Sequence, residues 1–315
     1  MDSNPSPVFP PDLERTVFET TAHFYPETIH SLLLVCRRVY EWIDGMKYAT
    51  VTVNIWNRRI RGTCPVDVLL REIQSQSKPA SFFHRHVQRL YVSGARSWGE
   101  DNIDLRQLFS ACSGIHNLVL YLDRRTIDSL HSDLAAIRPR RLAVLQGPSL
   151  LAQHVDQHTE MFTLLTHFYI VNDALLSIPF LRRHDPSPLP PYLARLPALT
   201  HFAMGGAFGT RTVTLAKDIL VTCKTLQVFV LIVTGDARSF PPVDDARFLY
   251  QTGSKEEFIR GWVAETRGGI DFWARADAVV AKKQRGEIQP ISRCWIETED
   301  GIPDILESIL TPSPA

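Results

Sequence analysis

One short apolar pattern occurs six times between residues 87 and 231, and it constrains the fold more than any other feature of the sequence. Each copy has apolar residues at its first, fourth and sixth positions, as in Val87, Leu90 and Val92. The fourth positions are Leu90, Leu118, Leu142, Phe168, Phe202 and Phe229, which are 28, 24, 26, 34 and 27 residues apart. Apolar residues at alternating positions predict a strand in each copy, with helical segments between them. We therefore expect the six residues to lie in neighbouring strands of one sheet.

The spacing of these strands is typical of leucine-rich repeats, in which one strand recurs about every 20–29 residues. The sequence departs from that family at the polar position that usually holds Asn, which is occupied by Ala95, Asp123, Gly147, Asp173, Ala207 and Thr234. Because the backbone groups of the turns then need other partners, we expect an irregular solenoid. The resemblance implies an α/β fold with a curved parallel sheet and helical returns. An ordinary α/β domain with a parallel sheet is the competing interpretation.

The alternation along each strand also predicts which side chains point away from the repeat core. Positions four and six would face inward, so positions three, five and seven would line the opposite face of the sheet. Tyr and Arg are enriched among the residues that dominate binding at interfaces. We therefore predict that a protein target binds an exposed strip on this face, made of Tyr91, Tyr121, Arg141, Tyr169 and His201. Ordinary exposed residues without a binding role are the alternative.

The C-terminal region supplies a candidate cover for the last predicted strand. Residues 228–232 are apolar on both faces, and a strand of this kind is buried on both sides. Asp271 is expected to cap a helix that carries Trp273 and ends before Gly286. A short strand is expected at residues 294–296. Open solenoids need covered ends, and this block is expected to provide such a cover.

The N-terminal region predicts two helices and a strand. Pro10 and its neighbouring proline suit the first turn of a helix, and Pro26 ends that segment. The apolar spacing predicts a second helix over residues 28–42. Alternating apolar residues predict a strand over residues 51–55.

The order of these N-terminal features resembles the F-box, a small helical module, over residues 9–18, 32–40 and 48–53. Two residues depart from its usual pattern, because Phe9 replaces a Leu and Tyr48 replaces a Trp. The resemblance implies docking onto the Skp-type adaptor of a cullin ubiquitin ligase. It also implies that the adaptor contacts, or their immediate supports, are Pro10, Leu13, Val17, Phe18, Leu33 and Val35. A helical cap on the repeats is the rival interpretation.

These features divide the sequence into three expected parts. Residues 1–56 would form the F-box-like helical module, 57–240 the degenerate leucine-rich-repeat solenoid, and 241–315 a helical capping region. The whole pattern, including the Gly-Gly-x-Asp-Phe-Trp segment at 268–273, resembles the F-box-like families expanded in mushroom-forming fungi.

Charge, apolar runs and cysteines exclude several classes of partner. The chain has 34 basic and 34 acidic residues, so no global field would draw it to nucleic acid or to a membrane surface. No apolar run approaches the roughly 18 residues that a membrane helix needs. The N-terminus shows no secretory signal, and the five cysteines are far apart, which indicates reduced thiols. We expect a cytoplasmic or nuclear protein that binds neither nucleic acid nor membrane.

The sequence carries no recognisable catalytic motif. His-Glu-x-x-His, paired Cys-x-x-Cys and Gly-x-Ser-x-Gly patterns are all missing. We therefore expect no catalytic residue, no cofactor and no metal. The predicted function is that of a non-catalytic substrate receptor of a Skp-cullin-type ubiquitin ligase, which binds a protein target through its repeat face. The alternative is a stand-alone leucine-rich-repeat scaffold for protein interactions, without a ligase role.

Overall fold

The structure, a computed structural model, describes residues 9–54, 63–93, 105–122, 124–144, 159–171, 189–205, 210–233, 235–253, 257–258, 261–262, 265 and 270–302. Within these residues, nine strands form one parallel sheet in the order β2-β1-β3-β4-β5-β6-β7-β8-β9. The strands are β1 (Thr50–Asn54), β2 (Cys64–Pro65), β3 (Arg89–Ser93), β4 (Asn117–Tyr121), β5 (Arg141–Val144), β6 (His167–Ile170), β7 (His201–Gly205), β8 (Val228–Val233) and β9 (Phe248–Thr252).

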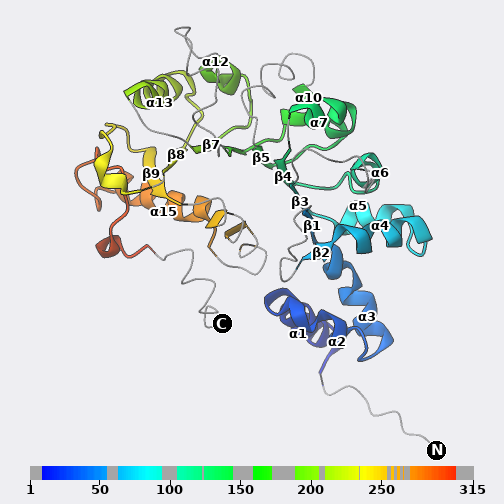
Figure 1. The fold of residues 1–315 in the computed structure, drawn as a ribbon. Helices are drawn as coiled ribbons and strands as arrows, with labels where there is room; N and C mark the ends of the chain where they lie inside the picture. The colour runs from blue at the N-terminus through cyan, green and yellow to red at the C-terminus, as the bar shows by residue number, and fades with distance from the viewer. Residues whose placement is uncertain are drawn as a thin grey trace, which may run out of the picture.

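Helices alternate with the strands and lie on the outer side of the sheet. The strands follow an arc, and the helices between them surround it on the outside (Figure 1). These helices are α4 (Val66–Ser75), α5 (Ala80–His86), α6 (Leu105–Ala111), α7 (Arg124–Ser129), α8 (His131–Ala136), α10 (Thr159–Phe162), α12 (Leu189–Ala194) and α13 (Thr210–Thr222). The sheet therefore has an outer, helix-covered face and an inner face.

The register between strands confirms the prediction made from the repeated pattern. Leu90 pairs with Leu118, and the same row continues through Leu142, Phe168, Phe202 and Phe229. The outer core contains the fourth and sixth positions of all six copies. Its aromatic rings follow one another at centroid distances of 5.9 Å for Phe168 and Phe202 and 5.3 Å for Phe202 and Phe229. A period-two pattern was sufficient to predict this register because a shift of one residue would turn the whole row to the other face.

The inner face of the sheet has an apolar core of its own. Tyr91, Tyr169 and Val230 pack there against the C-terminal segment, which includes the helix α15 (Phe272–Gln284). Figure 1 shows α15 inside the arc, beside β8 and β9. The expectation that residues 228–232 are covered is thus confirmed for Val228 and Val230, which are fully buried. Asp271 caps α15 as expected, and Gly286 follows the helix with a φ of 77°.

The N-terminal helices differ from the expectation in one respect. Helix α1 (Pro11–Phe24) begins and ends as predicted. The single helix expected over 28–42 is wrong, because the chain forms η1 (Pro26–Thr28), α2 (Ile29–Leu32) and α3 (Arg37–Ile43). The break lies in a run of four apolar residues, which cannot all face one side of a helix. This run is residues 32–35, and the backbone is extended at Cys36 directly after it. Leu32 and Leu33 pack inward, whereas Leu34 and Val35 are exposed.

Three further outcomes concern the expected parts of the chain. Strand β1, which we placed in the N-terminal module, pairs with β3 and β2 of the sheet, and β9 lies within the expected capping region. The strand expected at 294–296 is wrong, since this segment bonds to the sheet edge only where Cys294 accepts a backbone hydrogen bond from Tyr250. The six positions where leucine-rich repeats usually hold Asn lie outside the described residues.

Candidate interaction surfaces

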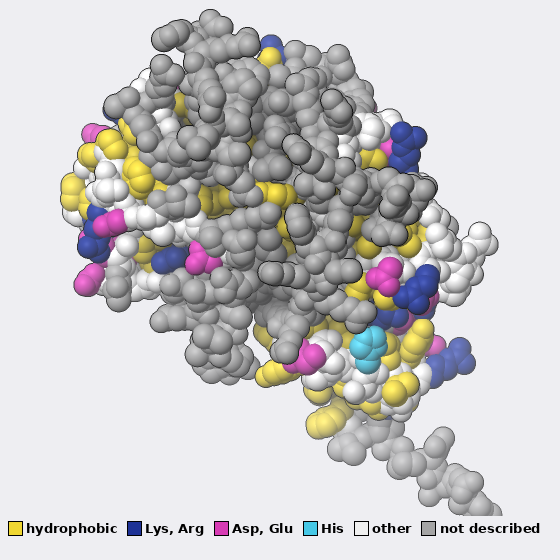
Figure 2. Space-filling model, in the orientation of Figure 1, with side chains coloured by type: hydrophobic (Ala, Val, Ile, Leu, Met, Phe, Trp, Pro, Cys, Tyr) yellow, Lys and Arg dark blue, Asp and Glu magenta, His cyan; other side chains and the backbone are white. Residues whose placement is uncertain are grey.

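The first candidate surface is the outside of the N-terminal helices. Two side chains one turn apart on α1, Leu13 and Val17, are each 56% exposed. The described part of the chain has eleven large apolar side chains that are exposed, and eight of them lie between residues 9 and 40: Phe9, Leu13, Val17, Phe24, Tyr25, Leu34, Val35 and Tyr40. Figure 2 shows hydrophobic side chains gathered on these helices at the bottom of the view. A concentration of this kind in one small module is typical of an interaction site.

A small core supports this surface from below. Ala22, Ile29, Val39 and Ile43 are buried together, with Phe18 and Leu33 packed against them. Of the six residues expected at the adaptor contact, the structure exposes Pro10, Leu13, Val17 and Val35 and half-buries Phe18 and Leu33. The two half-buried residues therefore support the surface, while the other four are accessible to a partner.

Six charged side chains of this module form three ion pairs. Arg15 pairs with Glu19 at 2.8 Å, Arg37 with Glu41 at 3.0 Å, and Arg38 with Glu14 at 2.7 Å. Exposed pairs of this kind contribute little to stability. They leave the apolar side chains as the distinguishing feature of the surface.

The module is fixed to the sheet through the 3-10 helix η2 (Asp44–Tyr48). Tyr48 is fully buried. Its ring packs edge-to-face against the rings of Phe82 and Phe83 of α5, with ring centroids 5.8 and 5.5 Å apart. Lys78 donates hydrogen bonds to the Asp44 carboxylate and, at 2.9 Å, to the Tyr40 hydroxyl. Burial lowers the pKa of Lys78, but these two partners outweigh it and raise the pKa above its usual value. This candidate surface is thus attached to the sheet through buried and hydrogen-bonded side chains.

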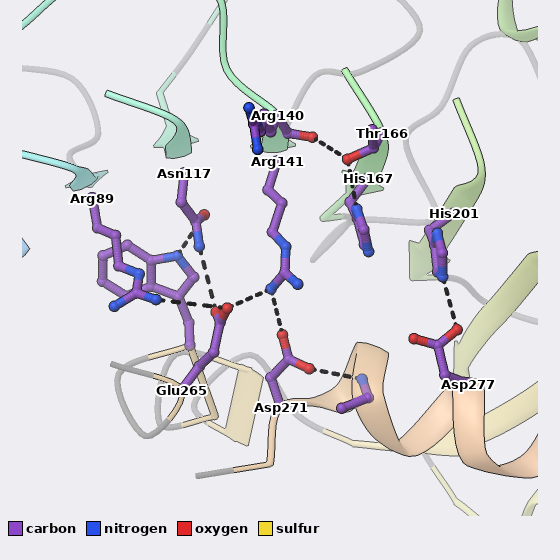
Figure 3. Close-up of polar contacts among 12 residues, drawn as sticks. Arg89, Asn117, Arg140, Arg141, Thr166, His167, His201, Glu265, Asp271 and Asp277 are labelled. Atoms are coloured by element: carbon purple, nitrogen blue, oxygen red, sulfur yellow. Dashed lines mark hydrogen bonds and ion pairs between the residues drawn. The ribbon is translucent and has the colours of Figure 1, made fainter. Parts of the chain in front are cut away.

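The second candidate site is a row of polar side chains on the inner face of the sheet. Arg89, Asn117, Arg141, His167 and His201 are successive register partners across β3 to β7. Figure 3 shows the row facing Glu265, Asp271 and Asp277 of the C-terminal segment.

Arg141 is the centre of this row. Its Nη1 donates to Glu265 Oε1 at 2.6 Å and to Asp271 Oδ2 at 2.8 Å. The other oxygen of Asp271 accepts from the backbone N–H of Ala274 at 2.8 Å, so one carboxylate both caps α15 and anchors it to the sheet (Figure 3). Asn117 accepts a hydrogen bond from Trp262 Nε1 at 2.9 Å.

Burial controls the charge states within the row. Burial raises the pKa of Glu265, as does Asp271 nearby, whereas Arg141 and Arg89 lower it. Burial also lowers the pKa of His167 to about 2, helped by His201 and Arg141, so this imidazole is neutral near pH 7. Neutral His167 stacks on His201 with ring centroids 4.0 Å apart, and His201 Nε2 lies 2.8 Å from Asp277 Oδ1.

The row has the geometry of a structural contact between the sheet and the C-terminal segment. Two imidazoles stacked face to face cannot both direct a ring nitrogen at one ion. Among the described residues, no three His, Cys, Asp or Glu side chains are grouped to hold a metal ion. The acidic residues that face the row, Glu265, Asp271 and Asp277, belong to the C-terminal segment of the same chain. They cover the inner side of the row.

The expectation of an exposed target-binding strip is wrong. Tyr91, Tyr169 and His201 are only 3%, 4% and 7% exposed, and Tyr121 and Arg141 are half-buried. The five residues do share one face, but Phe258, Trp262, Phe272 and Trp273 of the C-terminal segment pack on that face. Sequence reasoning identified Asp271 only as a helix cap and missed Glu265 and Asp277, since an acidic residue carries no local sign of its partner.

No protein-family model matches the chain, and no curated protein matches it. The described helices include none that is long and apolar enough to cross a membrane.

Proposed function

We propose that the chain is a non-catalytic substrate receptor whose N-terminal helices dock onto the Skp-type adaptor of a cullin ubiquitin ligase. The observation that carries the proposal is the exposure of Leu13, Val17 and Val35 on a module with its own small core. A module that served only to cap the sheet would turn such side chains toward the sheet. Burial of such exposed apolar side chains against a partner is favourable, because it removes apolar surface from water.

The arrangement of the sheet supports the same proposal. In this interpretation, the parallel strands and outer helices are an irregular array of leucine-rich repeats. The resemblance of residues 1–56 to the F-box indicates the partner of this array, the Skp-type adaptor. The rigid attachment through Tyr48 and Lys78 suits a receptor that must hold a target at a set place relative to the ligase. The chemistry of ubiquitin transfer would belong to the partner proteins.

The alternative function is a stand-alone scaffold for protein interactions. It retains the repeat array and leaves the N-terminal surface without an adaptor. The buried inner face argues equally in both cases against target binding on that face.

Co-purification with a Skp-type adaptor tests the proposal. We expect the intact chain to form a complex, and the double variant Leu13→Asp, Val17→Asp to lose it by at least tenfold in affinity. The matched control is Leu164→Asp, Val221→Asp, which changes two exposed apolar residues elsewhere, 49% and 65% exposed, and should leave the complex intact. No complex with the intact chain, or equal loss in both folded double variants, would remove the ligase function.

A further inference from the structure

A pocket of about 380 Å³ lies at the carboxyl ends of β8 and β9, beside the first turn of α15. Its walls include Ile232, Gln251, Gly253, Phe258, Phe272 and Trp295. The pocket is large enough for a small molecule, since such sites typically measure about 300–1,000 Å³. The carboxyl ends of parallel strands are also where open α/β sheets commonly bind ligands.

Gln251 is the residue that indicates a ligand. The residue is only 5% exposed, and its amide oxygen accepts no hydrogen bond from the described part of the chain. A buried acceptor without a donor is unfavourable, and a leucine of similar size would avoid the penalty. A polar residue at a position where an apolar one would be more stable is expected where function requires it.

Three other polar side chains of the pocket walls have partners of their own. The Tyr250 hydroxyl donates to the Pro241 carbonyl at 2.8 Å, and the Thr252 hydroxyl donates to the Gly235 carbonyl at 3.1 Å. Asp236 accepts from the backbone N–H of Arg238 at 2.9 Å. The amide oxygen of Gln251 differs from these groups, because it is buried without a partner in the described part of the chain.

The charges that line the pocket balance. Arg238 and Arg275 are matched by Asp236 and Glu257. Phe258, Phe272 and Trp295 contribute aromatic surface to the remaining walls, and aromatic surface favours flat apolar groups. A balanced rim gives no preference for a strongly charged ligand.

We propose that this pocket binds a neutral small molecule with a flat apolar body and an N–H or O–H group that donates to Gln251 Oε1. The aromatic walls enclose the body of the ligand, and the amide of Gln251 sets its orientation. The site lies at the opposite end of the sheet from the N-terminal module, so it does not depend on adaptor docking.

The probe for this site is N-phenyl-1-naphthylamine, a neutral fluorescent molecule with two aromatic groups and one N–H. Gly253→Leu should fill the pocket, because a Cβ at Gly253 would meet only ordinary contacts at 3.6 Å with Glu257 and Ile232. Gln251→Leu removes the acceptor and keeps the shape. The double variant Leu13→Asp, Val17→Asp is the control for binding to the exposed N-terminal surface.

We expect saturable binding of the probe to the wild type and to the N-terminal double variant. Binding should weaken at least tenfold in Gly253→Leu and about three- to tenfold in Gln251→Leu, as for one lost hydrogen bond. Thermal melting checks that each variant folds, and Gln251→Leu decides the matter if Gly253→Leu does not. Absence of saturable binding to the wild type, or unchanged affinity in a folded Gln251→Leu variant, would overturn the proposal.

Discussion

Replacing Arg141 by Met tests whether the polar row holds the C-terminal segment on the sheet. The change removes an ion-pair partner from two carboxylates, of which Asp271 is 6% exposed and Glu265, which keeps Arg89 at 3.7 Å, is 21% exposed. Breaking a fully buried ion pair from one side costs about 3–5 kcal/mol. Because the Arg141 side chain is 30% exposed, we expect roughly half of that, about 1.5–2.5 kcal/mol of unfolding free energy.

Urea unfolding followed by tryptophan fluorescence measures this loss, since Trp262 and Trp273 lie at the contact. The matched control is Arg138→Met, three residues earlier, whose pair with Glu160 has side chains 55% and 73% exposed. That pair should contribute only about 0–1 kcal/mol. Equal destabilisation by the two substitutions would refute the role of the polar row.

A second substitution separates the ion pair from the packing of the Arg141 side chain. Asp271→Asn keeps an acceptor for the backbone N–H of Ala274, and Asn caps helices about as well as Asp. In the Arg141→Met protein, Asp271→Asn should therefore restore part of the lost stability, because it removes an unpaired buried charge. Purely additive losses would show that the two residues are not coupled.

Two further predictions concern titration and close packing. His167 has its pKa lowered to about 2 from 6.5, so below pH 6.5 the unfolded chain gains a proton that the folded chain does not, and stability falls as pH drops. Urea unfolding at pH 6.5 and pH 5 should show a smaller fall for His167→Gln, by up to about 1.4 kcal/mol per pH unit; an identical fall would contradict the burial of this imidazole. Gly114→Ala would place a Cβ 1.8 Å from the His84 carbonyl oxygen, so we expect a loss of about 1–3 kcal/mol in thermal unfolding, whereas Gly253→Ala, with contacts at 3.6 Å, should be nearly neutral. Similar melting temperatures for the two alanine variants would show that the backbone near Gly114 moves aside.

The strand register could be predicted from sequence because it depends on local alternation. Leu90 to Phe229 each occupy the same place in a period-two pattern, and the parallel sheet needs only that the copies align. The helix cap at Asp271 was predictable for the same reason, since a cap is a relation between residues three apart. The break at Cys36 was not, because it depends on which of four apolar residues the small N-terminal core can accept.

The cover on the inner face could not be placed from sequence. Its polar contacts join residues 124 and 130 positions apart, from Arg141 to Glu265 and to Asp271. No periodicity relates such distant residues, and either sign of charge is ordinary on a solvated surface. The error about Tyr91 and Tyr169 follows from this, because outward alternation predicts the face of a side chain and not whether another segment lies on that face.

The buried inner face also limits where a receptor of this kind can bind a target. Four aromatic side chains of the cover, Phe258, Trp262, Phe272 and Trp273, are each at least nine-tenths buried. Burial of a large apolar side chain contributes about 1.5–3 kcal/mol, so the four together contribute roughly 6–12 kcal/mol. That range is comparable to the whole net stability of a typical protein, about 5–15 kcal/mol, so exposing the inner face to a target would be very unfavourable. Under the proposed function, a target therefore binds the outer helices or the ends of the sheet. The buried joint at Tyr48 then holds it at a set distance from the adaptor.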